Sequence, residues 1–335
     1  MSDYRKMAYA EATAAVQAFI ADHPGYELED EDPEVFAARL PRGTNFVLFG
    51  HHEDQPVVYK WYAADWGLKR FRNELAALEH FAATRCVPKI HAVAPDQLIV
   101  MDRLPGRFVD EEMIDALGVE GRQSLSRDVG RAVGELVVTP LPGGPAEAGL
   151  FVGEQIIPWD LDLEQAVNFY TDLCHRDLKV FPAGADPLYG ESLYLVEAQA
   201  KEICKQRHII FHEDLHFFSH RGRLAGIFDV EMCRYGTDLM QLERLFLQCG
   251  PKALDWESAF ASFSAVTGRQ LSEQDYVFLM AMAMFYFHIR ITRWGHPNPE
   301  QDYVAQFLPS IRASALRYAK YVDLRAYLPV WFEVS

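Results

Sequence analysis

The sequence predicts an α+β protein in two lobes, a small N-terminal lobe with an antiparallel sheet (residues 1–104) and a larger helical lobe (residues 105–335). Strand-like segments rich in β-branched and aromatic residues are concentrated in the first hundred residues. After Gly106, most apolar residues recur with helical spacing. A chain of 335 residues is also too long for one small core, which favours two lobes.

The N-terminal lobe is expected to begin with a helix and a β-hairpin. The stretch through Ala21 has helical spacing, and an acidic segment that contains proline follows at Glu27–Glu34. Asn45–Phe49 and Pro56–Tyr62 carry the residue types that favour strands. Because a turn-rich stretch separates them, they predict a hairpin.

A helix and two further strands are predicted to complete this lobe. Phe71–Ala83 has apolar residues on one helical face, namely Leu75, Leu78 and Phe81. Val87–Val93 and Gln97–Met101 are expected strands around a Pro-Asp turn. Arg103-Leu104-Pro105-Gly106 ends the pattern, so we expect the boundary between the lobes there.

The second lobe is predicted to be helical around a small β-structure. Helices are expected in four stretches: Arg122–Val138, Leu163–Leu173, Ser192–Gln206, and Leu239–Leu328 with turns near Gly268 and His296–Pro299. His208–Phe211 and Arg223–Asp229 are apolar and β-branched, and they predict two short strands.

The composition indicates a soluble, ordered protein. Hydrophobic residues make up 50% and charged residues 24%, which excludes a disordered chain. The formal net charge of −16 argues against nucleic acid as the partner. The longest apolar run, Tyr276–Phe287, is too short to span a bilayer, and Met1–His23 lacks the apolar core of a signal peptide. We expect a cytoplasmic protein with no membrane partner.

The cysteines do not suggest a disulfide framework or a zinc site. Their number is odd, their spacings are wide and no CxxC pair occurs. We expect free thiols in a reducing compartment, at Cys86, Cys174, Cys204, Cys233 and Cys249.

The N-terminal lobe contains candidates for binding the phosphates of a nucleotide. Before the hairpin lies a glycine-bearing turn that includes Gly43, Thr44 and Asn45. Lys60 ends the run Val57-Val58-Tyr59-Lys60, and Glu74 follows fourteen residues later on the predicted helix. An ion pair between Lys60 and Glu74 would direct the ammonium group toward the phosphates. Alone, each would be an ordinary surface residue, but their order favours the functional interpretation.

The strongest chemical signal lies between His212 and Asp229. Phe211-His212-Glu213-Asp214-Leu215-His216 is followed by Gly226-Ile227-Phe228-Asp229-Val230-Glu231. Phosphoryl transfer needs one carboxylate that accepts the acceptor's proton and another that holds Mg²⁺. Asp214 and Asp229 are the candidates for these two tasks.

These motifs resemble the aminoglycoside phosphotransferase and choline kinase superfamily, which has a protein-kinase-like fold. Its members carry a His-x-Asp-Leu-His block and then a strand that ends in aspartate, and the resemblance extends roughly over residues 35–310. It implies that Asp214 is the catalytic base, that His212 supports its loop, and that Asp229 binds Mg²⁺. It also implies that the purine of ATP or GTP is held by backbone groups of Met101, Asp102 and Arg103.

The chain departs from the family pattern at the second metal ligand. The family places an asparagine five residues after the catalytic aspartate, where this chain has Ser219. The segment before Asp229 is also shorter than in the family, so Ser219 or His216 is left as the substitute ligand. Thr237 and Gln241 replace two acids that usually brace the catalytic loop. A non-catalytic kinase fold that binds a nucleotide or another ligand is therefore an alternative.

Two other motifs suggest different functions. His212-Glu213-Asp214-Leu215-His216 matches HExxH, which predicts a zinc hydrolase if both histidines share a helical face. The β-like residues before it disfavour that helix. His175-Arg176-Asp177-Leu178-Lys179 spells the protein-kinase motif HRDLK. It lacks the asparagine and the Asp-Phe-Gly strand that should follow, so we interpret it as a charged turn or as part of the wall of the substrate site.

The expected acceptor is a small molecule rather than a protein. No Asp-Phe-Gly to Ala-Pro-Glu segment, which protein kinases use to dock peptides, is present in the sequence. An aminoglycoside- or choline-like compound with a hydroxyl or amine is expected, in a pocket of the helical lobe. The negative net charge is compatible with a cationic acceptor, but an acidic surface also keeps a protein soluble, and that simpler explanation is favoured.

Overall fold

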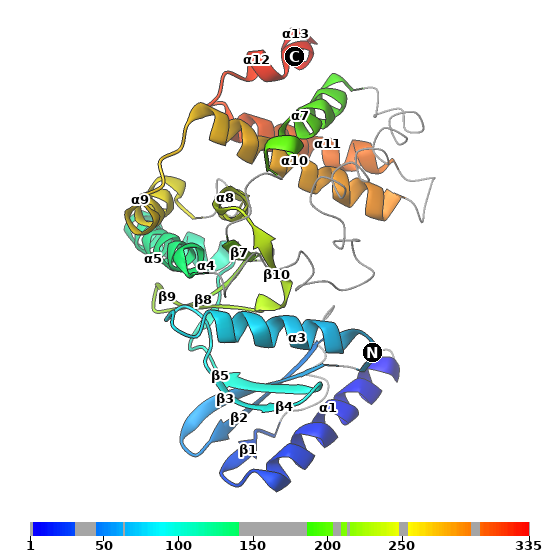
Figure 1. The fold of residues 1–335 in the computed structure, drawn as a ribbon, viewed down its shortest axis with the longest axis vertical. Helices are drawn as coiled ribbons and strands as arrows, with labels where there is room; N and C mark the ends of the chain where they lie inside the picture. Colours follow the sequence, from blue (N-terminus) through cyan, green and yellow to red (C-terminus); the bar gives the residue numbers. More distant parts are fainter. Residues whose placement is uncertain are drawn as a thin grey trace.

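A five-stranded antiparallel sheet forms the N-terminal part of the computed structural model (Figure 1). The structure describes residues 3–30, 45–62, 64–140, 186–203, 209–212, 215–247, 254–295 and 302–334. The strand order in the sheet is β1-β2-β3-β5-β4. Its strands are β1 (Tyr26–Leu28), β2 (Asn45–His52), β3 (Gln55–Tyr62), β4 (Ile90–Ala94) and β5 (Leu98–Asp102).

Helices cover both faces of this sheet. Helix α1 (Asp3–Asp22) packs on one face, and α3 (Ala64–His80) lies along the other, toward the helical part (Figure 1). Alternate residues of a strand point to opposite faces. On β3, Val57, Tyr59 and Trp61 pack with α1 in one apolar cluster. Lys60 and Tyr62 therefore face α3.

The C-terminal part consists of helices around two small antiparallel sheets. One sheet has the order β6-β8-β9 and the other pairs β10 with β7. The strands are β6 (Arg107–Phe108), β7 (Ile209–His212), β8 (His216–His220), β9 (Arg223–Phe228) and β10 (Cys233–Gly236), with the 3₁₀ turn η2 (Val230–Met232) before β10. The helices are α4 (Glu111–Ala116), α5 (Gly118–Val138), α7 (Pro187–Ile203), α8 (Asp238–Leu247), α9 (Trp256–Thr267), α10 (Glu273–Gly295), α11 (Tyr303–Tyr318), α12 (Leu324–Tyr327) and α13 (Pro329–Val334).

The main hydrophobic core runs from α3 through the helical part. It joins Tyr62 and Phe71 of the N-terminal part to residues as distant in sequence as Trp331. The methionines of α10, Met280, Met282 and Met284, are buried within it, as expected for core packing. None of the helices in the described part of the chain could span a lipid bilayer.

Most predicted elements are present, with shifted ends. Helix α3 begins at Ala64, seven residues before its predicted start at Phe71. The three-residue strand β1 lies at the start of the segment predicted only as acidic, and β8 was not predicted. The predicted helix at Leu163–Leu173 and the turn at His296–Pro299 lie outside the described residues. The lobe boundary at residue 104 stays a prediction.

Candidate active site

Lys60 is the centre of the candidate site. It lies in the middle of the sheet, where β3 pairs Lys60 with Val47 of β2 and Ile99 of β5. Its ammonium group donates to Glu74 Oε2 from α3, and Nζ lies 2.5 Å from Asp229 Oδ1, at the end of β9. The predicted ion pair between Lys60 and Glu74 is therefore present, and Asp229 joins it.

Glu74 is held on the buried side of this cluster. Its side chain is only 2% exposed, and the hydroxyl of Tyr62 donates a second hydrogen bond to its Oε2. Tyr62 follows Lys60 by two residues on β3, so both donors leave the same face of the strand. A buried carboxylate needs such partners, because an unpaired charge is costly to bury.

Asp229 has an unusual backbone conformation. Its φ of 61° and ψ of 48° lie in the left-handed region, which aspartate visits more readily than most residues other than glycine. Such conformations persist where surrounding contacts hold them and are concentrated at functional sites. The Asp229 side chain is 35% exposed, whereas Lys60 is 7% exposed. Asp229 therefore presents the accessible carboxylate of the cluster.

The acids fit a magnesium ion. Carboxylate oxygens of Glu74, Asp229 and Glu231 all lie within 4.8 Å of one another. Glu231 Oε2 is also 3.4 Å from the ammonium of Lys60. Carboxylate oxygens are the hard ligands that Mg²⁺ prefers, commonly with one or two protein carboxylates and several waters. Asp229 is the carboxylate of this group that solvent reaches, because its side chain is 35% exposed.

The charges of this cluster shift its proton equilibria. Burial alone would lower the pKa of Lys60, but Asp229 and Glu74 hold that pKa well above its ordinary value. Burial raises the pKa of Glu74 to about 7; Lys60 opposes this rise, and Asp229 adds to it. A raised pKa keeps the Lys60 ammonium charged, a property that phosphate binding would need.

The segment predicted to hold a purine leaves the sheet at the end of β5. Met101 is buried in the core. Asp102 Oδ1 lies 2.7 Å from His91 Nε2, and its Oδ2 accepts the backbone N–H of Lys89 at 3.1 Å. The Arg103 guanidinium donates to Glu29 Oε1 at 2.8 Å and lies 4.0 Å from the centre of the Phe49 ring. The side chains of Asp102 and Arg103 are therefore both bound to residues of the N-terminal part. Purine binding by the backbone of this segment stays a prediction.

The two candidate substitutes for the second metal ligand differ in position. His216 pairs with Phe228, the residue before Asp229, and its ring stacks on Phe228 with centroids 5.5 Å apart. Ser219 lies three residues further along β8, about 10 Å away at strand spacing, opposite Leu224. The structure therefore brings His216 to the neighbourhood of Asp229 and places Ser219 toward the far end of the hairpin.

Several predicted residues lie outside the described part of the chain. These are Gly43, Thr44, Asp214 and the HRDLK segment at 175–179. Of Asn45 and His212 the backbone is described, in β2 and β7, where His212 pairs with Cys233. The HExxH interpretation is wrong in its geometry, because His212 and His216 lie on two strands instead of one helix.

The partners of Glu231 were not predicted from the sequence. Arg70 Nη1 donates to Glu231 Oε1 at 2.7 Å, and Asn73 Nδ2 donates to the Glu231 carbonyl at 3.3 Å. Arg70 precedes Glu74 by four residues, a spacing that places both on one helical face. That spacing was the available signal, but only the fold shows that Glu231 lies opposite.

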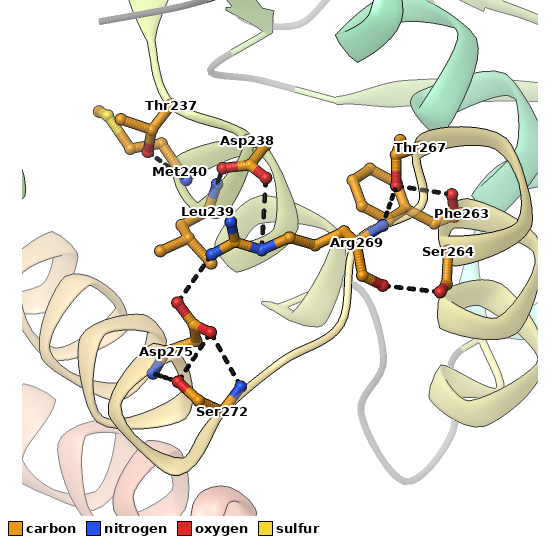
Figure 2. Close-up of polar contacts among 10 residues, drawn as sticks. All are labelled: Thr237, Asp238, Leu239, Met240, Phe263, Ser264, Thr267, Arg269, Ser272 and Asp275. Atoms are coloured by element: carbon orange, nitrogen blue, oxygen red, sulfur yellow. Dashed lines mark hydrogen bonds and ion pairs between the residues drawn. The ribbon is translucent and has the colours of Figure 1, made fainter. Parts of the chain in front are cut away.

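The segment after β10 is braced by a network centred on Arg269 (Figure 2). Arg269 Nε lies 3.4 Å from Asp238 Oδ2, and its Nη2 donates to Asp275 Oδ1 at 2.7 Å.

Thr237 Oγ1 accepts the backbone N–H of Met240 at 3.2 Å and so caps α8. Thr237 stands where the family has an acid, and here it caps the helix with a hydroxyl.

A buried lysine on a strand, a glutamate on the helix behind it and an aspartate after a distant strand define a phosphotransferase of kinase-like fold. The chain belongs to the phosphotransferase enzyme family, whose pattern matches residues 37–241. No curated protein matches the sequence.

Solved structures share this fold. The ADP-bound aminoglycoside phosphotransferase APH(2'')-Ib aligns over 89% of this chain and 96% of its own, with 11% identity and a TM-score of 0.58. The GDP complex of wild-type aminoglycoside 2'-phosphotransferase-IIIa aligns over 90% and 98%, with 14% identity and a TM-score of 0.60. The macrolide 2'-phosphotransferase MphH from Brachybacterium faecium aligns over 89% and 97%, with 16% identity and a TM-score of 0.55.

Proposed function

We propose that this protein transfers the terminal phosphoryl group of ATP or GTP to a hydroxyl or amine of a small molecule. One observation carries the proposal: Lys60 contacts both Glu74 and Asp229, which lie 14 and 169 residues further along the chain. This arrangement matches the lysine, helix glutamate and metal-binding aspartate of phosphoryl transfer in kinase folds. Membership of the phosphotransferase enzyme family supports it.

In the proposed reaction, the acceptor's oxygen or nitrogen attacks the terminal phosphorus in line. A bond from this atom to phosphorus forms, the bond to the bridging oxygen breaks, and the nucleoside diphosphate leaves. Asp214 takes the acceptor's proton, while Lys60 neutralises charge on the phosphates. A Mg²⁺ ion held by Asp229, with Glu231 beside it, would neutralise charge that develops on the phosphate oxygens.

The acceptor is proposed to be aminoglycoside- or choline-like. Solved structures of the same fold include a gentamicin complex and a kanamycin complex. The formal net charge of −16 also favours attraction of a cationic acceptor. Structures with ADP and with GDP occur among the neighbours, so both ATP and GTP are candidate donors.

The test is phosphoryl transfer from each nucleotide to a panel of aminoglycosides, macrolides and amino alcohols. Wild type is compared with Asp229→Asn and Asp214→Ala, and with Asp22→Asn on the exposed end of α1 as the control. We expect transfer by wild type and the control, and a loss of at least about 100-fold in both active-site variants. Nucleotide binding without transfer to any acceptor would instead indicate a non-catalytic binding protein.

A further inference from the structure

Two side chains of α3 hold the segment that follows Asp229. Arg70 Nη1 donates to Glu231 Oε1 at 2.7 Å. Asn73 Nδ2 donates to the backbone carbonyl of Glu231 at 3.3 Å. Both donors are on the helix that carries Glu74, and η2 packs along this helix. The Glu231 side chain and its backbone are thus each bound to α3.

Glu231 lies between two cations. Its Oε1 accepts from Arg70 and its Oε2 is 3.4 Å from Lys60 Nζ. The Glu231 side chain is 5% exposed and that of Arg70 20%. A guanidinium keeps its charge at any pH that a protein tolerates. In such a shielded site, a fixed hydrogen-bonded cation restricts the carboxylate to one orientation.

The same bonds anchor the chain two residues beyond Asp229. Its left-handed conformation, with φ of 61°, must be held by neighbouring contacts. Glu231 is only two residues away, so anchoring its carbonyl and carboxylate limits how far Asp229 can move. A displacement of α3 would shift Glu74, Glu231 and Asp229 together.

We propose that Arg70 is a positioning residue for the metal-binding acids, acting through Glu231 with the assistance of Asn73. The inference rests on the proposed function, in which Asp229 holds a divalent cation. Residues behind metal ligands commonly set metal affinity through orientation, and replacing them weakens binding about 10- to 100-fold.

Electrostatics and positioning make opposite predictions for the loss of Arg70. Removing a cation makes the site more negative, which by itself tightens binding of a divalent cation. Losing the hydrogen bond from Arg70 to Glu231 weakens binding of the divalent cation, because Glu231 is no longer held in place. A measured weakening in Arg70→Met therefore reports positioning. Arg70→Lys keeps the charge but lacks the planar, forked geometry of the guanidinium, so it separates the two effects again.

The experiment titrates Mn²⁺ into the protein saturated with ADP and follows the free ion by electron paramagnetic resonance. Arg70→Met and Arg70→Lys are compared with wild type and with Arg72→Met, a matched control on α3 whose arginine pairs with Asp96 at the surface. We expect affinity about 10- to 100-fold weaker for Arg70→Met, an intermediate value for Arg70→Lys, and no change for Arg72→Met. Equal or tighter binding by Arg70→Met overturns the inference.

Asn73→Ala keeps the inference testable if Arg70→Met does not fold. It removes the bond to the Glu231 carbonyl without changing charge, and a several-fold weaker Mn²⁺ affinity is expected. Wild-type affinity in Asn73→Ala would then overturn the inference. If the wild-type protein binds neither ADP nor Mn²⁺, the proposed function fails as well. A working wild type with an unaffected Arg70→Met overturns the positioning role alone.

Discussion

Lys60 and Asp229 are in direct contact, with Nζ 2.5 Å from Oδ1, although 169 residues separate them in sequence. Lys60 is fixed by strands on both sides, and Asp229 directly follows β9, a strand of a different sheet. The contact therefore ties the N-terminal sheet to the C-terminal part at the candidate site. Glu74 completes this connection from α3, and its burial makes the cluster sensitive to the loss of Lys60.

Lys60→Met should destabilise the protein more at alkaline than at acidic pH. Without Lys60, the pKa of Glu74, already about 7, rises further. When the pKa of a carboxyl is higher in the folded than in the unfolded chain, the folded state holds a proton at pH values where the unfolded state has released it. The free energy of unfolding therefore falls as pH rises through the pKa of the folded state. Leaving a buried charge unpaired costs about 3–5 kcal/mol, which applies at high pH where Glu74 is ionised.

Urea unfolding of Lys60→Met at about pH 6 and about pH 9, on either side of the Glu74 pKa of about 7, measures this pH dependence of stability. The double variant Lys60→Met/Glu74→Gln is the control, because it removes the titrating carboxyl. Most of the added pH dependence should disappear in it. Identical pH dependence in the single and double variants would assign the effect to other groups.

The sequence predicted the parts of the site that follow local patterns. Lys60 and Glu74 lie within one strand–helix unit, so their order along the chain was informative. The contact between Arg70 and Glu231 joins residues 161 positions apart, and no local pattern records it. Asp229 was recognised through a motif, but its left-handed backbone is visible only in the fold.

The elements that were misplaced depend on tertiary contacts. Gly67 weakens the helical pattern before Phe71, yet α3 begins at Ala64. The packing of this helix against η2 and β3 outweighs the local preference. Strand β8 has only five residues and begins at the last residue of the His212–His216 motif. It forms a strand because it pairs with β6 and β9. The strand propensities of single residues contain no information about such pairing between distant segments.

Arg269→Met should destabilise the C-terminal part by about 1.5–3 kcal/mol, the range for hydrogen bonds to charged groups. Arg269 joins Asp238 at the start of α8 to Asp275 of α10 (Figure 2). Thermal unfolding of the variant measures the loss, with the surface variant Arg72→Met as control. Adding Asp275→Asn to Arg269→Met should cost less than Asp275→Asn costs alone. Strict additivity would show that the two side chains do not stabilise each other.

His80 should make stability fall at acidic pH. Burial lowers the pKa of this imidazole, whose ring packs edge-on to Phe81 with centroids 4.7 Å apart. Among the described residues, its Nε2 has no hydrogen-bond partner. The unfolded chain therefore binds a proton at higher pH than the folded one. The stability is complete above the unfolded pKa and decreases as pH falls through it.

His80→Phe removes this titration while keeping a ring beside Phe81. Relative to wild type, the variant should become more stable when the pH is lowered from about 8 to about 5. These values lie on either side of the ordinary histidine pKa of about 6.5. Urea unfolding at both pH values measures it. A difference independent of pH would mean that the His80 pKa is the same in the folded and unfolded chains.

Two helix glycines should respond oppositely to alanine. A Cβ on Gly130 of α5 would lie 1.9 Å from the carbonyl oxygen of Ala259 on α9, so the helices must separate. A Cβ on Gly190 of α7 meets no described atom within 4 Å. Gly130→Ala should cost about 1–3 kcal/mol or more through overpacking. Gly190→Ala should gain about 0.5–1 kcal/mol, because alanine loses less backbone entropy in a helix. Chemical denaturation compares the two, and equal effects would contradict the close packing of α5 on α9.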